Sequence, residues 1–211
     1  MSDPISYTEL KMTEQGKEGR FSFRPLDANK DVELLYSWMH QKHIAPFWKL
    51  DVPKPELESW VHRSVNAEHK DCYIGTYNGE TVCYLIAYNI EKDPIKEYYH
   101  YQPGDLGMHL LIGPRSTLNK ENGLSLIRAM IFFLFDRYGA KRIIGEPDRR
   151  NRVIIPILKQ VGGSILGRIH LPNKEASLIV GEKGLFERSL QDQDVEIEVV
   201  NRMVTPEGRY V

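Results

Sequence analysis

The sequence predicts a fold of mixed α and β structure, in the α/β (α+β) class, in which helices flank a mixed β-sheet. Two strand-like runs, "CYIGTY" and "ETVCYLIAYNI", are separated by Asn78-Gly79, the strongest hairpin signal available from sequence. The stretch "DLGMHLLIGPRSTLNKENGLSLIRAMIFFLFDRYG" then passes from an apolar strand through a polar connection into a long apolar helix, and another strand follows. Because such crossovers join parallel strands with a right-handed turn, the strands Leu106 to Ile112 and Arg142 to Glu146 should be parallel neighbours or near neighbours.

Before the hairpin, the sequence predicts one strand and two helices. "RFSFRPL" has strand character, and "DVELLYSWMH" carries apolar residues at helical spacing. In "KPELESWVHRSV", Pro55 occupies an early helical position, where proline is tolerated. The apolar faces predicted for the two helices are Leu34, Leu35, Trp38 and Met39 in the first and Leu57, Trp60, Val61 and Val65 in the second.

After the hairpin, the helix of the crossover is expected from Leu124 to Tyr138, with Gly139 as the residue that ends it. "KRIIGEPD" predicts a strand, and "NRVIIPILKQVGG" predicts a shorter helix interrupted by Pro156. "SILGRIHL" and "EASLIVGE" form a closing strand pair joined at Pro172-Asn173. The tail after Leu190 is compatible with either an extra strand or a loose arm.

Composition narrows the function classes. The 211 residues, 41% of them hydrophobic, suit one domain with a core of about residues 20–190 and a C-terminal tail at 191–211. The net charge of -1, with 28 basic and 29 acidic residues spread along the chain, makes nucleic acid an unexpected partner. We also expect no membrane partner and a cytoplasmic location, because the N-terminus lacks an apolar signal segment and no window has the roughly 20 apolar residues of a membrane span. The oligomeric state stays open.

The two cysteines give no sign of redox or metal chemistry. Cys72 and Cys83 lie in strand-like runs, where buried and inert thiols are expected. His40 and His43 have i, i+3 spacing, but no carboxylate or thiolate accompanies them. We therefore predict no metal site.

One histidine and one aspartate suggest an acid/base pair. A strand paired in parallel inside a sheet is covered on both faces, so His109 in "MHLLIG" needs a polar partner. Asp148 follows the neighbouring strand, where open α/β sheets place ligand-contacting groups. The alternative is that a backbone carbonyl satisfies His109 and that Asp148 caps the helix beginning near Asn151.

Two connecting segments could contact ligands. "GPRSTLNKENG" brings Arg115 and Lys120 to the start of a long helix, whose free N–H groups and dipole favour an anion such as a diphosphate. It matches neither GxxxxGK(S/T) nor GxGxxG, so a helix-start loop without a ligand is the alternative. "HIAPFWKLDVP" carries Phe47 and Trp48 in a segment too broken by proline for a helix, and it either lines a pocket or seals the core.

The order of these elements, from "FRPLDANKDVELLYSW" to "SLIVGEKGLFERSL", resembles the GNAT superfamily of acyl-CoA-dependent N-acyltransferases. "HIAPFW", "GMHLLIGP" and "IIGEPDRRN" more narrowly resemble the branch that makes hydroxamate siderophores, namely the aerobactin-type N-hydroxylysine acetyltransferases and the mycobactin lysine acyltransferase. The resemblance covers roughly residues 20 to 190. It implies a mostly antiparallel sheet in which one parallel strand pair splays apart to admit the pantetheine arm of CoA.

The resemblance also implies roles for particular residues. Asp148 matches the general base, and His109 matches the residue that orients the acceptor or shares its proton. The glycine signature of the family is reduced to "STLNKENGL", and the position of its thiolate-protonating tyrosine falls near Leu158. By this resemblance, acyl-CoA contacts Leu110, Leu111, Ile112, Arg115, Asn122, Gly123, Leu124 and Asn151, and the acceptor contacts His43, Phe47 and Trp48.

These expectations combine into a predicted function. The chain should transfer an acyl group, in the first place acetyl, from acetyl-CoA or another acyl-CoA to an N-hydroxylated amine of the N-hydroxylysine or N-hydroxy-diaminopropane type, in siderophore biosynthesis for iron acquisition. One alternative is an N-acetyltransferase for another amine such as an aminoglycoside, whose site should be strongly acidic, whereas "HIAPFWKLD" offers aromatics and the single Asp51. The other alternative is a non-catalytic GNAT-like domain that binds acyl-CoA.

Overall fold

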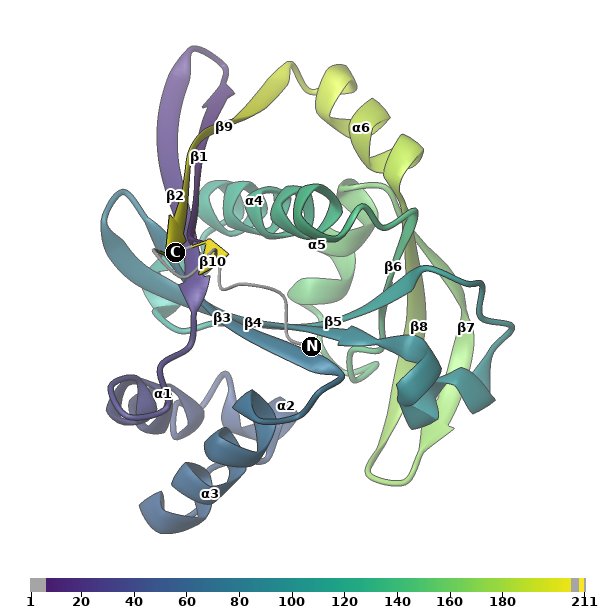
Figure 1. Cartoon of the computed structure of the whole chain (residues 1–211). Coiled ribbons are helices and arrows are strands. Elements are labelled where there is room, and N and C mark those ends of the chain that lie inside the picture. Colours follow the sequence, from purple (N-terminus) through teal and green to yellow (C-terminus); the bar gives the residue numbers. More distant parts are fainter. Residues whose placement is uncertain (1–6, 206–208, 211) are drawn as a thin grey trace.

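The computed structural model describes residues 7–205 and 209–210, and the strands in this part of the chain form one ten-stranded sheet (Figure 1). Its order is β10-β9-β1-β2-β3-β4-β5-β6-β8-β7. The strands are β1 (Tyr7–Glu14), β2 (Lys17–Pro25), β3 (Lys70–Tyr77), β4 (Glu80–Asn89), β5 (Asp105–Ile112), β6 (Arg142–Gly145), β7 (Gly163–Leu171), β8 (Lys174–Glu182), β9 (Val195–Thr205) and β10 (Arg209–Tyr210). The α-helices are α1 (Val32–Met39), α2 (Ala45–Trp48), α3 (Lys54–Val65), α4 (Lys120–Tyr138), α5 (Ile154–Gln160) and α6 (Lys183–Asp192), and the 3-10 turns are η1 (Ile90–Lys92), η2 (Pro94–Tyr98) and η3 (Arg115–Leu118).

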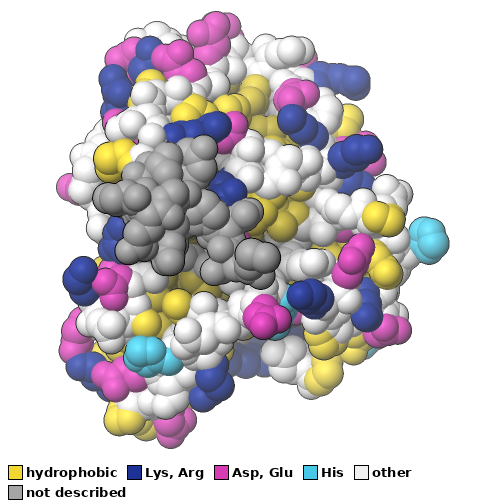
Figure 2. Space-filling view, viewed as in Figure 1, with side chains coloured by type: hydrophobic (Ala, Val, Ile, Leu, Met, Phe, Trp, Pro, Cys, Tyr) yellow, Lys and Arg dark blue, Asp and Glu magenta, His cyan; other side chains and the backbone are white. Residues whose placement is uncertain are grey.

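The sheet separates two layers of helices. Helices α4, α5 and α6 lie against one face, and α1, α2 and α3 lie against the other (Figure 1). On the first face, the rings of Phe23 and Phe133 stack with centroids 4.5 Å apart. On the second face, Trp38 and Leu57 are buried against the sheet. Basic and acidic side chains are interspersed on the surface drawn in Figure 2.

The predicted mixed sheet with one splayed parallel pair is confirmed. Strands β5 and β6 are paired in parallel at only three positions, which end at Gly107 and Ile144. Beyond them β5 continues along β4 as far as Ile112, whereas β6 ends at Gly145. At the closed end, the Arg142 guanidinium donates to both oxygens of Asp105, at 2.7 and 2.6 Å. This buried pair holds the two strands together just before they separate.

Two predicted chain reversals are confirmed by backbone geometry. Asn78 and Gly79 adopt φ angles of 48° and 85°, as a two-residue hairpin turn requires. Gly139 ends α4 with φ of 61°, and its N–H donates to the Phe135 carbonyl. Cys72 and Cys83 are buried free thiols, as predicted, and burial raises the pKa of both.

Several predicted boundaries were wrong. Helix α4 begins at Lys120 and not at Leu124, because the Asn119 side chain accepts the Asn122 N–H at 2.8 Å and starts the helix earlier. Phe47 and Trp48 belong to the one-turn helix α2, where no helix was expected. Pro156 does not interrupt α5, since it falls in the first turn, where its missing N–H has no partner to lose.

The helix faces and the chain ends also required correction. Val65 is exposed and Leu34 only partly buried, because α3 and α1 turn Ser64 and Val32 toward the core. The tail forms β9, which pairs with β1 in antiparallel fashion. The sequence reading did not predict β1 or α6. No helix in the described residues is long and apolar enough to cross a membrane.

Candidate active site

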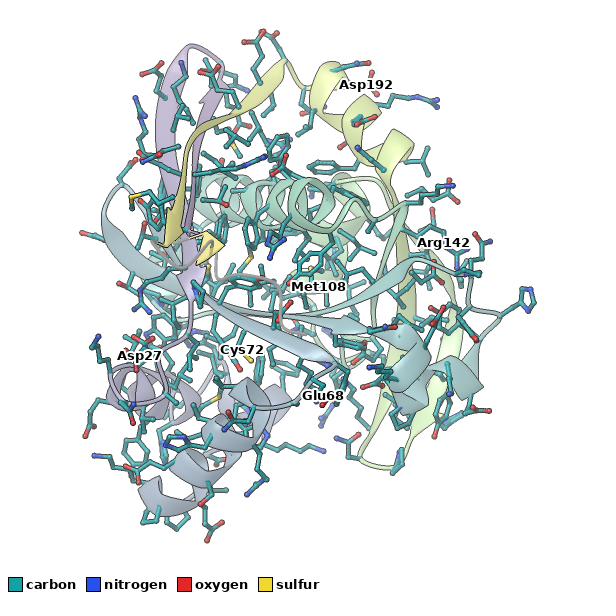
Figure 3. All side chains as sticks on the ribbon, viewed as in Figure 1. Asp27, Glu68, Cys72, Met108, Arg142 and Asp192 are labelled. Carbon is teal, nitrogen blue, oxygen red and sulfur yellow. The ribbon has the colours of Figure 1, made fainter. Side chains whose placement is uncertain are left out.

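A cavity of about 310 Å³ opens where β5 and β6 diverge. It lies beside the inner strands β5 and β6. Met108, labelled near the middle of Figure 3, contributes to its wall from β5. Side chains from α2, α3 and the loop after β6 complete it. The residues that line it are Phe47, Trp48, Leu50, Trp60, Lys70, Ile86, Met108, His109, Leu110, Gly145, Glu146, Pro147, Asp148, Asn151, Ile154, Leu158, Asn173 and Lys174.

His109 reaches this cavity because of strand alternation. It pairs in register with Ile86 of β4, which belongs to the core on the α1–α3 side, so its ring points to that side. The ring stacks on Tyr88 with centroids 4.9 Å apart and planes 20° apart. Its Nδ1 lies 3.2 Å from Oε1 of Glu146. The partner of His109 is therefore a carboxylate, and the alternative of a backbone carbonyl was wrong.

Glu146 is the residue that the sequence reading missed. It directly follows β6 and is 5% exposed. Because it is two residues after Ile144, which packs on the α1–α3 side, it faces that same side. Besides His109, it accepts a hydrogen bond from the Tyr88 hydroxyl at 3.0 Å. A glutamate at the predicted end of a strand, next to a proline, carries no special signal, and its contact with His109 is visible only in the tertiary structure.

This contact assigns the protonation of His109. Burial lowers the pKa of His109, and the charge of Glu146 opposes that shift only in part. The ring is therefore neutral at neutral pH. Because Nδ1 faces the Glu146 carboxylate, it carries the proton, and Nε2 keeps a lone pair that can accept a hydrogen bond.

Asp148 lines the same cavity but is held by other groups. Its carboxylate is paired with the Arg150 guanidinium at 2.7 and 2.9 Å, and it accepts the Arg150 backbone N–H. These hydrogen bonds lower the pKa of Asp148 to about 2. The alternative in which Asp148 caps the next helix was wrong, because the Asn151 side chain accepts the Ile154 N–H that begins α5.

The predicted acceptor residues are separated by the structure. Phe47 and Trp48 line the cavity, and the edge of Trp48 faces His109 with centroids 6.4 Å apart. His43 does not line the cavity, because it lies in the turn before α2. Phe47 and Trp48 are within α2, and this helix directs both rings into the cavity. The Nε2 atom of His43 is buried without a hydrogen-bond partner among the described residues.

The predicted acyl-CoA residues lie along the splayed strand and at the start of α4. Leu110 lines the cavity of about 310 Å³ between β5 and β6, as does Asn151, and because the predicted acceptor residues Phe47 and Trp48 also line it, we call it the acceptor cavity. The side chains of Leu111 and Ile112 are buried, so neither side chain is available to a ligand. Gly123 lies in the first turn of α4. Arg115 is exposed in η3 and does not line the acceptor cavity.

The free edge of β5 has a definite orientation. The Gly113 N–H donates to the Val82 carbonyl of β4, and antiparallel pairing alternates, so Leu111 and His109 also direct their backbone groups toward β4. Leu110 and Ile112 direct theirs toward β6, which has already ended. These backbone groups have no strand partner on that side in the described part of the chain.

A second cavity, of about 590 Å³, lies over the start of α4. Asn122 and Leu124, both predicted to contact acyl-CoA, line it together with residues of the β1–β2 hairpin and of α5. Its wall carries the basic residues Lys17 and Arg152 and the acidic residues Glu14 and Glu18, of which Glu14 is paired with Arg128. The cavity and the free edge of β5 therefore offer the groups that a long ligand with a phosphate at one end would need.

Comparison with known proteins identifies the family. Residues 27–171 match the family described as the acetyltransferase (GNAT) domain. The chain belongs to this family. A GNAT relative, the N-hydroxyputrescine acetyltransferase of Acinetobacter baumannii, is 32% identical over 158 residues, which are 75% of this chain and 76% of that protein. A lysine N-acyltransferase of Mycobacterium tuberculosis is 29% identical over 149 residues, which are 70% of this chain and 71% of that protein.

Solved structures agree with this assignment. An uncharacterized protein from Bacillus halodurans superposes with a TM-score of 0.81 and 31% identity, over 88% of this chain and 96% of that chain. An aminoglycoside acetyltransferase in complex with coenzyme A and kanamycin superposes with a TM-score of 0.70 and 25% identity, over 80% of this chain and 98% of that chain. The predicted GNAT membership is confirmed, and the relatives match the predicted branch.

The chain is therefore an acyl-CoA-dependent N-acetyltransferase. Acetyl-CoA, as the acyl donor, supplies an acetyl group activated as a thioester. The residues present fit it, because the free backbone edge at Leu110 and Ile112 leads from the acceptor cavity toward the start of α4. No group of His, Cys, Asp and Glu in the described residues could hold a metal ion.

Proposed function

We propose that this GNAT enzyme acetylates the nitrogen of an N-hydroxylated amine in hydroxamate siderophore biosynthesis. The observation that carries the proposal is the Asp148–Arg150 ion pair in the acceptor cavity, because two guanidinium hydrogen bonds, at 2.9 and 2.7 Å, lower the pKa of Asp148 and make its carboxylate a weak base. The similarity to an N-hydroxyputrescine acetyltransferase, 32% identical to this chain, supports an N-hydroxylated amine as the acceptor.

In the proposed reaction, the acceptor nitrogen attacks the acetyl carbonyl carbon. A C–N bond forms, the C–S bond breaks, and CoA leaves as the thiol. Asp148 takes the proton that the nitrogen loses, and this proton ends on the departing sulfur. One backbone N–H group on the free edge of β5, at Leu110, stabilises the developing oxyanion, a contribution of about 2.7–4 kcal/mol per donor. His109 accepts a hydrogen bond from the acceptor hydroxyl through Nε2 and so orients the nitrogen.

A weak base suits a hydroxylamine better than an alkylamine. An alkylamine is protonated at neutral pH and must lose a proton before it can attack, whereas a hydroxylamine is already neutral. Its N–H becomes strongly acidic only as the C–N bond forms, and a carboxylate held by Arg150 can then accept it. The low pKa of Asp148 thus favours the hydroxylated acceptor.

An aminoglycoside is the second candidate acceptor, because the fold superposes on an aminoglycoside acetyltransferase bound to kanamycin. Several ammonium groups would need an acidic cavity. Here the charged residues of the cavity wall are Lys70 and Lys174 against Glu146 and Asp148. This balance of charge disfavours a polycation.

The test combines two readings of the same reaction. CoA release is followed with a thiol reagent, and the product is treated with Fe³⁺, which gives a coloured complex with an N-acetyl hydroxamate but not with an O-acetyl ester. N6-hydroxylysine, N-hydroxy-diaminopropane, lysine and kanamycin are compared. We expect CoA release and colour only with the hydroxylamines. Turnover confined to kanamycin or lysine would refute the proposal.

The role of Asp148 has its own test. Asp148→Asn should lower kcat by roughly 10²-fold or more, because it removes the proton acceptor. The affinity for acetyl-CoA should change little. Arg150→Gln is the matched control, since it removes the ion pair but leaves the carboxylate. If Asp148→Asn turned over at the normal rate, Asp148 would have only a structural part.

A further inference from the structure

Two lysines in the acceptor cavity have no part in the proposed chemistry. Lys174 begins β8, its side chain is 17% exposed, and its Nζ lies 3.9 Å from Oε1 of Glu146. Lys70 begins β3 and is half-buried. It pairs in register with Tyr88, the residue on which the His109 ring stacks. Both lysines therefore lie close to the His109–Glu146 contact.

The carboxylates of the cavity are already engaged by the protein. Asp148 forms an ion pair with Arg150, and Glu146 accepts from Tyr88 and contacts His109. The Lys70 side chain forms no hydrogen bond or ion pair with any described residue, and its positive charge opposes protonation of His109. A partly buried cation without a partner is costly, and an anionic ligand group would remove that cost.

The size of the cavity limits what could bring this anion. At about 310 Å³ it is at the small end of ligand pockets, which span roughly 300–1,000 Å³. One amino acid with a long side chain fits such a space. A diamine would instead place an ammonium group near Lys70, where two like charges repel each other.

We propose that Lys70 and Lys174 form a carboxylate-binding subsite, and that the acceptor is an N-hydroxylated basic amino acid and not an N-hydroxylated diamine. This inference rests on the proposed function and deepens it by naming the acceptor class. The α-carboxylate binds the two ammonium groups, while the hydroxylamine at the other end of the acceptor reaches His109 and Asp148. The subsite selects the acceptor and takes no part in bond formation.

The test uses two acceptors that differ in one group. N6-hydroxylysine and N-hydroxycadaverine have the same chain and hydroxylamine, but only the first carries a carboxylate. We expect kcat/KM for N6-hydroxylysine to exceed that for N-hydroxycadaverine by roughly 10- to 100-fold, the range of one charge-assisted hydrogen bond. Equal values of kcat/KM would overturn the subsite.

Variants locate the effect in the two lysines. Lys70→Met keeps most of the apolar part of the side chain and removes its charge, and we expect it to lower kcat/KM for N6-hydroxylysine roughly 10-fold more than kcat/KM for N-hydroxycadaverine. Lys174→Met should act in the same direction. Lys92→Met, at an exposed position in η1, is the matched control and should behave as the unmodified enzyme. Equal losses with both acceptors would assign the lysines a purely structural part.

The two proposals fail in different ways. If lysine or kanamycin is acetylated and neither hydroxylamine is, the proposed function is wrong. Calorimetric binding of lysine and cadaverine to the Asp148→Asn enzyme then tests the subsite without turnover. Tighter binding of lysine, lost in Lys70→Met, would support the subsite, and equal binding would overturn it.

Discussion

Replacing Glu146 by Gln tests how the tautomer of His109 is set. Glu146 accepts from the Tyr88 hydroxyl at 3.0 Å and lies 3.2 Å from Nδ1 of His109. A glutamine has one carbonyl oxygen and one NH₂ group in place of two acceptor oxygens. If the oxygen keeps the Tyr88 hydrogen bond, the NH₂ group faces Nδ1, which must then accept. The proton of the imidazole moves to Nε2, and the lone pair proposed to orient the acceptor is lost.

The size of the effect follows from the burial of each partner. Tyr88 is 2% exposed and keeps a partner in Glu146→Gln, so the free energy of unfolding should fall by no more than about 1.5 kcal/mol. In Glu146→Ala the Tyr88 hydroxyl is left buried and unpaired, which costs about 1–3 kcal/mol. Loss of the orienting hydrogen bond should lower kcat/KM for the hydroxylamine roughly 10- to 100-fold.

Three measurements together check this reasoning. Urea unfolding separates the stability loss from the kinetic loss. Steady-state kinetics should show a larger loss with N6-hydroxylysine than with lysine, which has no hydroxyl to orient. Nitrogen NMR should show the proton of His109 on Nδ1 in the unmodified enzyme and on Nε2 in Glu146→Gln. A normal kcat/KM, or a proton that stays on Nδ1, would refute the assignment.

Three further predictions follow from single contacts. Because burial lowers the pKa of His109, its NMR titration should have a midpoint below 6.5. Glu146→Gln should move the midpoint lower still, since the charge of Glu146 raises that pKa. A midpoint above 6.5 would contradict the assigned neutral ring. Asn119→Ala removes the acceptor of the Asn122 N–H and should lower the free energy of unfolding by about 1 kcal/mol in urea, with Asn119→Ser as the control that restores a cap. Gly107→Ala places a Cβ 2.1 Å from the Tyr88 ring and should cost about 1–3 kcal/mol in thermal unfolding while also lowering activity; an unchanged melting temperature would show that the ring can move freely.

Much of the sheet was predictable because its signals are local. The hairpin at Asn78-Gly79 needs positive φ at both residues, and few sequences other than Asn-Gly supply it. The order strand, helix, strand from β5 through α4 to β6 predicts a parallel pair, because a connection of this length containing a helix joins parallel strands in one sheet. The N-terminal strand β1 was missed because it and β9 stabilise each other across nearly the whole chain, and neither carries a strong pattern alone.

The site was predictable only in part. His109 and Asp148 were singled out from residue type and from position next to predicted strands, and both line one cavity. Their real partners, Glu146 and Arg150, were not predicted. His43 was grouped with Phe47 and Trp48 because they are close in sequence, but the one-turn helix α2 separates them in space.

By itself, the sequence determined the family, the order of elements and the residues that carry chemical groups, since these depend on local pattern and on the spacing of motifs. The tertiary structure alone decided which groups meet. The ladder between β5 and β6 stops at Gly107, and this divergence opens the cavity and lets Glu146 reach His109. Partners far apart in the chain, such as Lys70 and Lys174, are brought to one wall only when the sheet forms, because side-chain contacts depend on register and no local pattern encodes them.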